Sequence, residues 1–152
     1  MCTKSKNQVQ VSVIIVNYLS AKGQALAKNP KTCLSFFWET MEQQIIVRGT
    51  AEKLPEHESD NYFESRPTGS KLGALASNQS QVIGSRELLD NRLKELEQVY
   101  KDTEIPRPKH WGGYLVKPSS IEFWQGRTNR MHDRIVYRLN DKKNWSIQRL
   151  CP

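Results

Sequence analysis

Segments rich in β-branched and aromatic residues lie toward both ends of this chain, and segments with helical periodicity lie between them. This distribution predicts an α+β fold with an antiparallel sheet that closes into a barrel. We expect strands over residues 11–17, 33–38, 44–53, 113–117, 121–125, 135–139 and 145–150. We expect helices over residues 20–28, 55–66, 71–76 and 85–101.

Local signals set several of these boundaries. Pro55 suits the first position of a helix, and Ser70 suits the cap of the helix over 71–76. The sequence Asn140-Asp141-Lys142 predicts a hairpin turn between the last two strands. In the longest helix one apolar stripe indicates packing rather than chemistry, and it comprises Leu89, Leu93, Leu96 and Tyr100.

Composition limits the class of protein. The chain has 152 residues, of which 37% are hydrophobic, so we expect one domain with a real core. No apolar run is long enough to span a membrane, and no cleavage site follows the N-terminal lysines, so we expect neither a membrane segment nor a signal peptide. The net charge of +7 favours acidic partners.

The cysteines and histidines point to a reducing compartment. Cys2, Cys33 and Cys151 form no CxxC pair and lie at no metal-ligand spacing from a histidine. We therefore expect free thiols, no bound metal and a cytoplasmic location.

The stretch from Ile121 to Arg134, IEFWQGRTNRMHDR, gathers an indole, an imidazole and several guanidinium groups. On an extended strand Arg130, His132 and Arg134 would point to one side and Asp133 to the other. Such a row suits a flat anionic ligand that carries a phosphate, a carboxylate or an electron-rich ring. From this stretch alone, a strand with a solvated charged face is an equally good interpretation.

A second constellation comprises Tyr62, Arg66 and Ser70. Tyr62 and Arg66 are four apart on a predicted helix, and the turn at Pro67 brings Ser70 and the next helix N-terminus close to them. This arrangement predicts a phosphate cradle. The alternative is an ordinary helix cap beside a surface arginine.

Two further segments are polar enough to contact an anion. The first holds Asn78, Gln79, Ser80 and Gln81 after an Ala-rich helix, and the alternative is a polar loop. The second holds Ser20 and Lys22 after the first strand. The glycine spacings of a P-loop and of a Rossmann site are both absent, as is a GxSxG elbow.

Taken together, these segments resemble the pyridoxamine 5'-phosphate oxidase family. The resemblance runs from about residue 17 to residue 152, and it is strongest in YFESRPTGSKLGALASNQS, HWGGYLV, IEFWQGRTNRMHDR and WSIQRLCP. It implies a split β-barrel flavoprotein of Greek-key type, which forms a homodimer with FMN at the subunit interface. It also implies oxidation of pyridoxine or pyridoxamine 5'-phosphate to pyridoxal 5'-phosphate, with hydride transfer to the flavin and reoxidation by dioxygen to give hydrogen peroxide.

The resemblance assigns roles to individual residues. It implies that FMN contacts Lys22, Gln44, Gln79, Ser80, Trp124 and Arg134. It implies that the substrate phosphate binds Tyr62, Arg66 and Ser70. Arg130 and His132 match a catalytic pair that packs over the substrate ring, where their charge steadies a phenolate oxygen.

The chain also departs from the family pattern. Residues 1–10 lack the family's Arg-x-Val-Leu-Leu-Lys strand, so we expect an N-terminally truncated barrel: an atypical segment over residues 1–16 and the family domain, with its dimerisation region, over residues 17–152. Val16 replaces a threonine near the flavin, and Ala21 replaces an arginine at its phosphate.

Three functions follow as hypotheses. The first is the FMN-dependent oxidase, and the second is an impaired relative that binds pyridoxal 5'-phosphate without tight FMN. The third is a nucleic-acid-binding barrel, which the charge favours but which the absence of a basic run with interleaved aromatics disfavours. We expect a homodimer with no nucleic-acid or membrane partner.

Overall fold

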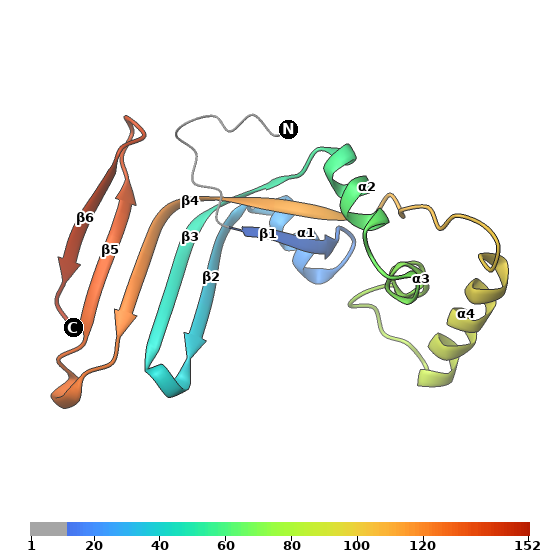
Figure 1. The fold of residues 1–152 in the computed structure, drawn as a ribbon, viewed down its shortest axis with the longest axis horizontal. Coiled ribbons are helices and arrows are strands. Elements are labelled where there is room, and N and C mark those ends of the chain that lie inside the picture. The colour runs from blue at the N-terminus through green and yellow to red at the C-terminus, as the bar shows by residue number, and fades with distance from the viewer. Residues whose placement is uncertain (1–11) are drawn as a thin grey trace. The chain divides into compact units, whose positions relative to one another are not determined.

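The structure, a computed structural model, describes residues 12–152 (Figure 1). Two compact units make up this part of the chain. The sheet unit contains Pro30–Glu52 and Leu115–Pro152, and the helical unit contains Val13–Asn29 and Lys53–Tyr114. Of the cysteines, Cys33 and Cys151 are exposed and free, and Cys2 lies outside the described residues. The predicted segment 1–16 also falls mostly outside them.

The strands are β1 (Ser12–Asn17), β2 (Lys31–Trp38), β3 (Gln43–Lys53), β4 (Trp111–Gln125), β5 (Asp133–Leu139) and β6 (Trp145–Leu150). The helices are α1 (Ala21–Lys28), α2 (Glu56–Glu64), α3 (Thr68–Ala76) and α4 (Arg86–Val99), with short 3-10 turns η1 (Glu39–Met41) and η2 (Thr128–Arg130). None of these helices is long and apolar enough to cross a membrane. The predicted α+β class with an antiparallel sheet is confirmed.

In the sheet unit the strand order is β2-β3-β4-β5-β6, while β1 pairs with β4. The hairpins β2–β3, β4–β5 and β5–β6 are antiparallel. The predicted turn between β5 and β6 is confirmed by the bond from the Lys143 N–H to the Asn140 carbonyl. A Cβ on Gly49 of β3 would lie 2.2 Å from the Lys117 carbonyl of β4, so only glycine fits this close approach of two backbones.

The core of the helical unit is aromatic and aliphatic. Phe63 from α2, Leu72 from α3, Ile105 and Trp111 are buried together. Phe63 is only 1% exposed, and its ring meets the Trp111 indole edge-on at 5.0 Å between centroids. From the predicted stripe of α4, Leu93, Leu96 and Tyr100 pack against this cluster, which confirms the packing role of that stripe.

Three predicted boundaries were wrong. The separate strands 113–117 and 121–125 form one strand, β4, because proline's fixed φ lies within the β region and Pro118 removes one donor without ending the strand. Ser70 is not a cap: α3 begins at Thr68, after Pro67, and Ser70 lies inside its first turn. Pro55 flanks α2 as its N-cap instead of occupying its first position.

Replacement of Phe63 by alanine is expected to lower the free energy of unfolding by about 3–5 kcal/mol, because it leaves a cavity against Trp111. Urea denaturation followed by circular dichroism measures this change. Val82→Ala in the same unit is the control, since Val82 is fully exposed and its loss is expected to cost less than about 0.5 kcal/mol. Equal costs for the two variants would contradict the proposed core.

Candidate functional site

The helical unit contains a pocket of about 380 Å³ with polar side chains on its wall. Arg66, Ser70 and Gln79 line it together with the Trp111 indole and the end of β1. Local chain geometry brings the first two together. The Arg66 N–H donates to the Phe63 carbonyl as α2 ends, and the Ser70 N–H donates to the Pro67 carbonyl as α3 begins. Two of the three predicted cradle residues therefore face one cavity.

Arg66 is the most unusual side chain in this pocket. Its Nη1 is buried and has no hydrogen-bond partner among the described residues. Its guanidinium carbon lies 4.9 Å from the centroid of the Trp111 ring, a cation–π distance. A buried guanidinium nitrogen without an acceptor is costly unless something else satisfies it. Arg66 therefore keeps an unused donor beside a pocket that its side chain helps to line.

Tyr62, the third predicted cradle residue, does not line this pocket. Its ring stacks parallel to the Trp111 indole, with 6.2 Å between centroids and 8° between planes. Half of the surface of Tyr62 is exposed. Tyr62 and Arg66 thus both contact the ring of Trp111.

Ser20 and Lys22, the anion contacts predicted after the first strand, have different roles in the structure. The Ser20 hydroxyl accepts from the Gly23 N–H at 3.1 Å and donates to the Asn17 carbonyl at 2.7 Å, so it caps α1. Lys22 is exposed in the first turn of that helix, where no acidic residue lies beside it. Lys22 is accordingly the member of this pair that remains able to meet a ligand.

Gln79 and Ser80 lie in a turn that follows α3. The Gln81 N–H donates to the Asn78 carbonyl at 3.1 Å and closes the turn. Ser80 adopts a left-handed conformation with a φ of 70°, which is uncommon for a residue other than glycine. Both side chains are exposed, and Gln79 reaches the wall of the Arg66 pocket.

In the sheet unit three predicted ligand residues, Gln44, Trp124 and Arg134, share one side of the strands with Glu122, and we call this side the polar face. Trp124 of β4 is directly opposite Arg134 of β5, and Glu122 lies two residues before Trp124 on the same strand. Gln44 donates to the Ser35 hydroxyl at 3.1 Å. An indole, an amide and a guanidinium are thereby presented on one surface.

Glu122 holds the arginine of the polar face in place. Glu122 is 5% exposed, and its Oε1 accepts from Arg134 Nε at 2.8 Å and lies 2.7 Å from Arg134 Nη2 in an ion pair. Arg48 Nη1 lies 3.6 Å from its other oxygen, and Arg134 Nη1 also donates to the Cys151 carbonyl. The sequence analysis missed Glu122, although its spacing of two from Trp124 places both on one face.

The predicted row of Arg130, His132 and Arg134 on an extended strand was wrong. Residues Thr128–Arg130 form a short turn instead of an extended strand, and within it Asn129 and Arg130 depart from helical geometry with positive φ of 57° and 60°. Strand β5 begins only at Asp133. His132 and Arg134 keep the two-residue spacing, and the His132 ring lies 4.9 Å from the Trp124 ring, but Arg130 leaves the row.

Charge pairs close the loop before β5. Asp133 accepts from Arg127 Nε at 2.9 Å and from Arg149 Nη1 at 2.5 Å. Hydrogen bonds from Arg127 and Arg149 lower the pKa of the Asp133 carboxyl below its usual value. The carboxylate therefore remains ionised at neutral pH, and its contribution to stability is lost only as the pH falls through that lowered pKa.

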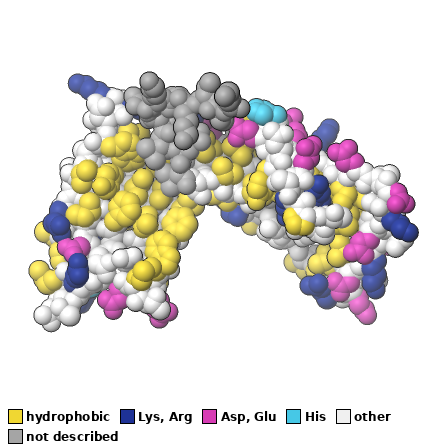
Figure 2. Space-filling model, in the orientation of Figure 1, with side chains coloured by type: hydrophobic (Ala, Val, Ile, Leu, Met, Phe, Trp, Pro, Cys, Tyr) yellow, Lys and Arg dark blue, Asp and Glu magenta, His cyan; other side chains and the backbone are white. Residues whose placement is uncertain are grey.

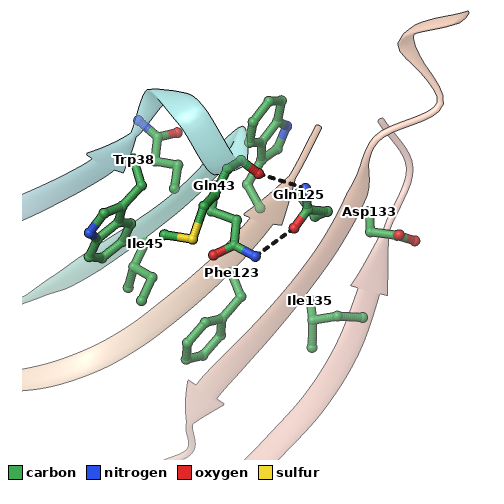
Figure 3. Close-up of a pocket in the computed structure, with 10 residues that line it drawn as sticks. Trp38, Gln43, Ile45, Phe123, Gln125, Asp133 and Ile135 are labelled. Atoms are coloured by element: carbon green, nitrogen blue, oxygen red, sulfur yellow. Dashed lines mark hydrogen bonds between the residues drawn. The ribbon is translucent and has the colours of Figure 1, made fainter. Parts of the chain in front are cut away.

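The opposite side of the sheet unit carries a hollow of about 370 Å³, lined by Trp38, Ile45, Phe123 and Ile135 (Figure 3). At its rim Gln43 donates to the side-chain oxygen of Gln125 at 2.8 Å. Figure 2 shows hydrophobic side chains gathered over the strands of this unit. Trp38 and Phe123 are each about two-fifths exposed, so this apolar face has the character of a surface that another molecule covers.

Replacement of Glu122 by alanine is expected to lower the free energy of unfolding by about 2 kcal/mol, because it leaves the Arg134 guanidinium without its carboxylate. Thermal or urea denaturation measures the change. Glu52→Ala is the matched control, since Glu52 pairs with Lys117 on an exposed part of the same unit and its loss is expected to cost under about 1 kcal/mol. A smaller loss for Glu122 than for Glu52 would refute its anchoring role.

Comparison with known proteins shows the family. The sequence model described as pyridoxamine 5'-phosphate oxidase matches residues 9–100, and the model of the pyridoxine 5'-phosphate oxidase C-terminal dimerisation region matches residues 111–152. The pyridoxine/pyridoxamine 5'-phosphate oxidase of Flavobacterium psychrophilum is 56% identical over 140 residues, and that of Trichormus variabilis is 53% identical over 140 residues. Each match covers 92% of this chain and 65% of the relative.

Solved structures agree in fold. PhzG from Burkholderia lata, in complex with tetrahydrophenazine-1-carboxylic acid, has a TM-score of 0.86 at 29% identity, covering 94% of this chain and 69% of that one. A pyridoxamine 5'-phosphate oxidase-related, FMN binding protein from Nostoc punctiforme has a TM-score of 0.68 at 14% identity, covering 92% of this chain and 71% of its own, and supports the split-barrel fold alone. The chain spans 65% of the length of the curated relatives above, and it belongs to the pyridoxamine 5'-phosphate oxidase family.

Proposed function

We propose that this chain takes part in the FMN-dependent oxidation of pyridoxine or pyridoxamine 5'-phosphate to pyridoxal 5'-phosphate. The observation that carries the proposal is the buried, unpartnered Arg66 nitrogen above the Trp111 ring. A phosphorylated substrate supplies the anionic oxygen that this nitrogen lacks. The family of the chain and the names of its relatives support the reaction.

The substrate phosphate is assigned to Arg66, Ser70 and Tyr62. Arg66 donates from the pocket wall, Ser70 contributes a hydroxyl from the first turn of α3, and Tyr62 contributes its exposed phenol from the stack on Trp111. Helix N-termini favour anions, because their first N–H groups have no partner within the helix. These groups bind and orient the substrate.

The residues assigned to FMN have the chemistry that a flavin nucleotide requires. In the helical unit Lys22 offers a cation to the phosphate, and Gln79 and Ser80 offer an amide and a hydroxyl. In the sheet unit Trp124 offers an aromatic surface beside Arg134 and Gln44. When bound, FMN supplies the hydride acceptor and passes the electrons to dioxygen, which becomes hydrogen peroxide.

Arg130 and His132 are assigned to the substrate ring as the catalytic pair. Within residues 12–152 the Arg130 guanidinium makes no ion pair, so its charge is available to an anionic ring oxygen. His132 is held against Trp124, next to the residues assigned to the flavin. These two side chains position and polarise the substrate, while the redox chemistry belongs to the cofactor.

The active form is assigned to a homodimer. The match of residues 111–152 to a dimerisation region supports this assignment. The apolar face of the sheet unit supports it physically, since Phe36, Trp38 and Phe123 are exposed there and a second copy would remove them from water.

A second candidate is a binder of pyridoxal 5'-phosphate without tight FMN. The observation that favours it is Ala21, which lies exposed in the first turn of α1 and carries no charge beside Lys22. The Arg66 pocket lies entirely within the helical unit and does not depend on that position.

Purified protein that is incubated with FMN and desalted is expected to keep a flavin absorption spectrum. Anaerobic addition of pyridoxine 5'-phosphate is expected to bleach that spectrum, because the substrate reduces the bound flavin. A colourless protein would overturn the proposed oxidase. Binding of pyridoxal 5'-phosphate by that colourless protein would support the second candidate.

Replacement of Arg66 by glutamine is expected to weaken binding of pyridoxine 5'-phosphate roughly 10- to 100-fold, the effect of one lost charge-assisted hydrogen bond. Isothermal titration calorimetry measures the dissociation constant, and circular dichroism checks the fold. Arg92→Gln, on the exposed side of α4, is the control and is expected to bind like the unmodified chain. Unchanged binding by the Arg66 variant would refute the assignment of the substrate phosphate to this pocket.

A further inference from the structure

The imidazole of His132 has one ring nitrogen committed to the backbone. The N–H of Arg127 donates to His132 Nδ1 at 3.2 Å. A backbone N–H can only donate, so Nδ1 must keep its lone pair. A neutral imidazole carries its single proton on the other nitrogen, and that nitrogen is therefore Nε2.

The donor of this hydrogen bond is itself fixed by the loop before β5. The Arg127 side chain donates to Asp133 Oδ2, while Arg149 from β6 donates to the other carboxylate oxygen. One residue earlier, the Gly126 N–H donates to the Glu42 carbonyl at 2.7 Å. Arg127 is thus held on both sides, and its N–H is aimed by contacts that do not involve His132.

The ring of His132 has a second fixed contact. The Trp124 indole lies 4.9 Å away at an angle of 44°, and Trp124 is in register with Arg134 on the neighbouring strand. Rotation of the imidazole by half a turn about the Cβ–Cγ bond would put the Cδ2 carbon in the place of Nδ1 and end the bond from the Arg127 N–H. The indole and the Arg127 N–H together favour one orientation of the ring.

We propose that Asp133 is a positioning residue that acts through Arg127 to fix His132 as the Nε2–H tautomer. His132 then presents Nε2–H to a ligand as a hydrogen-bond donor, while Arg130 presents a guanidinium that makes no ion pair within residues 12–152. This changes the role that the resemblance gave to His132, whose charge was expected to steady a phenolate. The identity of the ligand rests on the proposed function, whereas the tautomer does not.

Long-range proton–nitrogen NMR of the ¹⁵N-labelled chain, without flavin or substrate, tests the tautomer. At about pH 8 an ordinary imidazole is neutral, and its protonated and unprotonated nitrogens resonate far apart. The chain has three histidines. The signals that are missing from the spectrum of His132→Gln are those of His132. His57, exposed on α2, serves as the internal reference for a ring that exchanges between tautomers.

The two nitrogens of His132 are expected to be further apart in chemical shift than those of His57, with the proton on Nε2. A separation equal to that of His57, or a proton on Nδ1, would overturn the proposal. Neither result depends on FMN, so a colourless protein would contradict the oxidase and leave this inference standing.

Asp133→Asn tests the route through Arg127. The variant keeps the shape of the side chain but loses the charge that holds the guanidinium, so the His132 separation is expected to fall toward that of His57. Arg127→Gln, which keeps the backbone N–H, is expected to act in the same way and covers the case in which the first variant does not fold. Glu52→Gln, at another exposed pair of the sheet unit, is the control. An unchanged His132 spectrum in a folded Asp133 or Arg127 variant would refute the positioning role.

Discussion

The helical unit depends on the Trp111 indole, which three different interactions share. Phe63 meets it edge-on, Tyr62 stacks parallel to it, and the Arg66 guanidinium lies over it. The backbone of Trp111 is fixed as well, since its carbonyl accepts from Arg107 Nη1 at 2.6 Å. One side chain therefore links the core of the unit to a buried guanidinium nitrogen that lacks a partner among the described residues. Packing and ligand chemistry meet at the same ring.

Two arginines assigned to ligands are held in opposite ways, Arg134 in the sheet unit and Arg66 in the helical unit. In the sheet unit carboxylates organise the arginines: Glu122 holds Arg134, and Asp133 holds Arg127. In the helical unit the Arg66 guanidinium is oriented by an aromatic surface, which restrains the group without satisfying its donors. A carboxylate orients a guanidinium and occupies its N–H donors. An aromatic ring restrains the guanidinium but leaves its N–H donors free to bind an anion. The first arrangement suits positioning, and the second suits capture of an anion.

Much of the fold could be predicted from local pattern, and the failures share a cause. Strands β5 and β6 and the stripe of α4 follow from periodicity, which reports burial directly. The turn at Asn129 and Arg130 could not be predicted, because Arg130, unlike a glycine, gives no local signal for the positive φ that it adopts. The anchoring role of Glu122 was likewise invisible, since a carboxylate in a strand reads as solvated until its arginine partners are known.

The left-handed turn has a thermodynamic consequence. Asn129 tolerates this conformation, but for Arg130 it carries a cost of about 1–3 kcal/mol, which the surrounding loop contacts offset during folding. A ligand that binds Arg130 in this conformation meets no further cost of reaching the positive φ, because the folded loop already has it. The cost of this conformation is therefore met when the chain folds, and it does not reduce the free energy of binding.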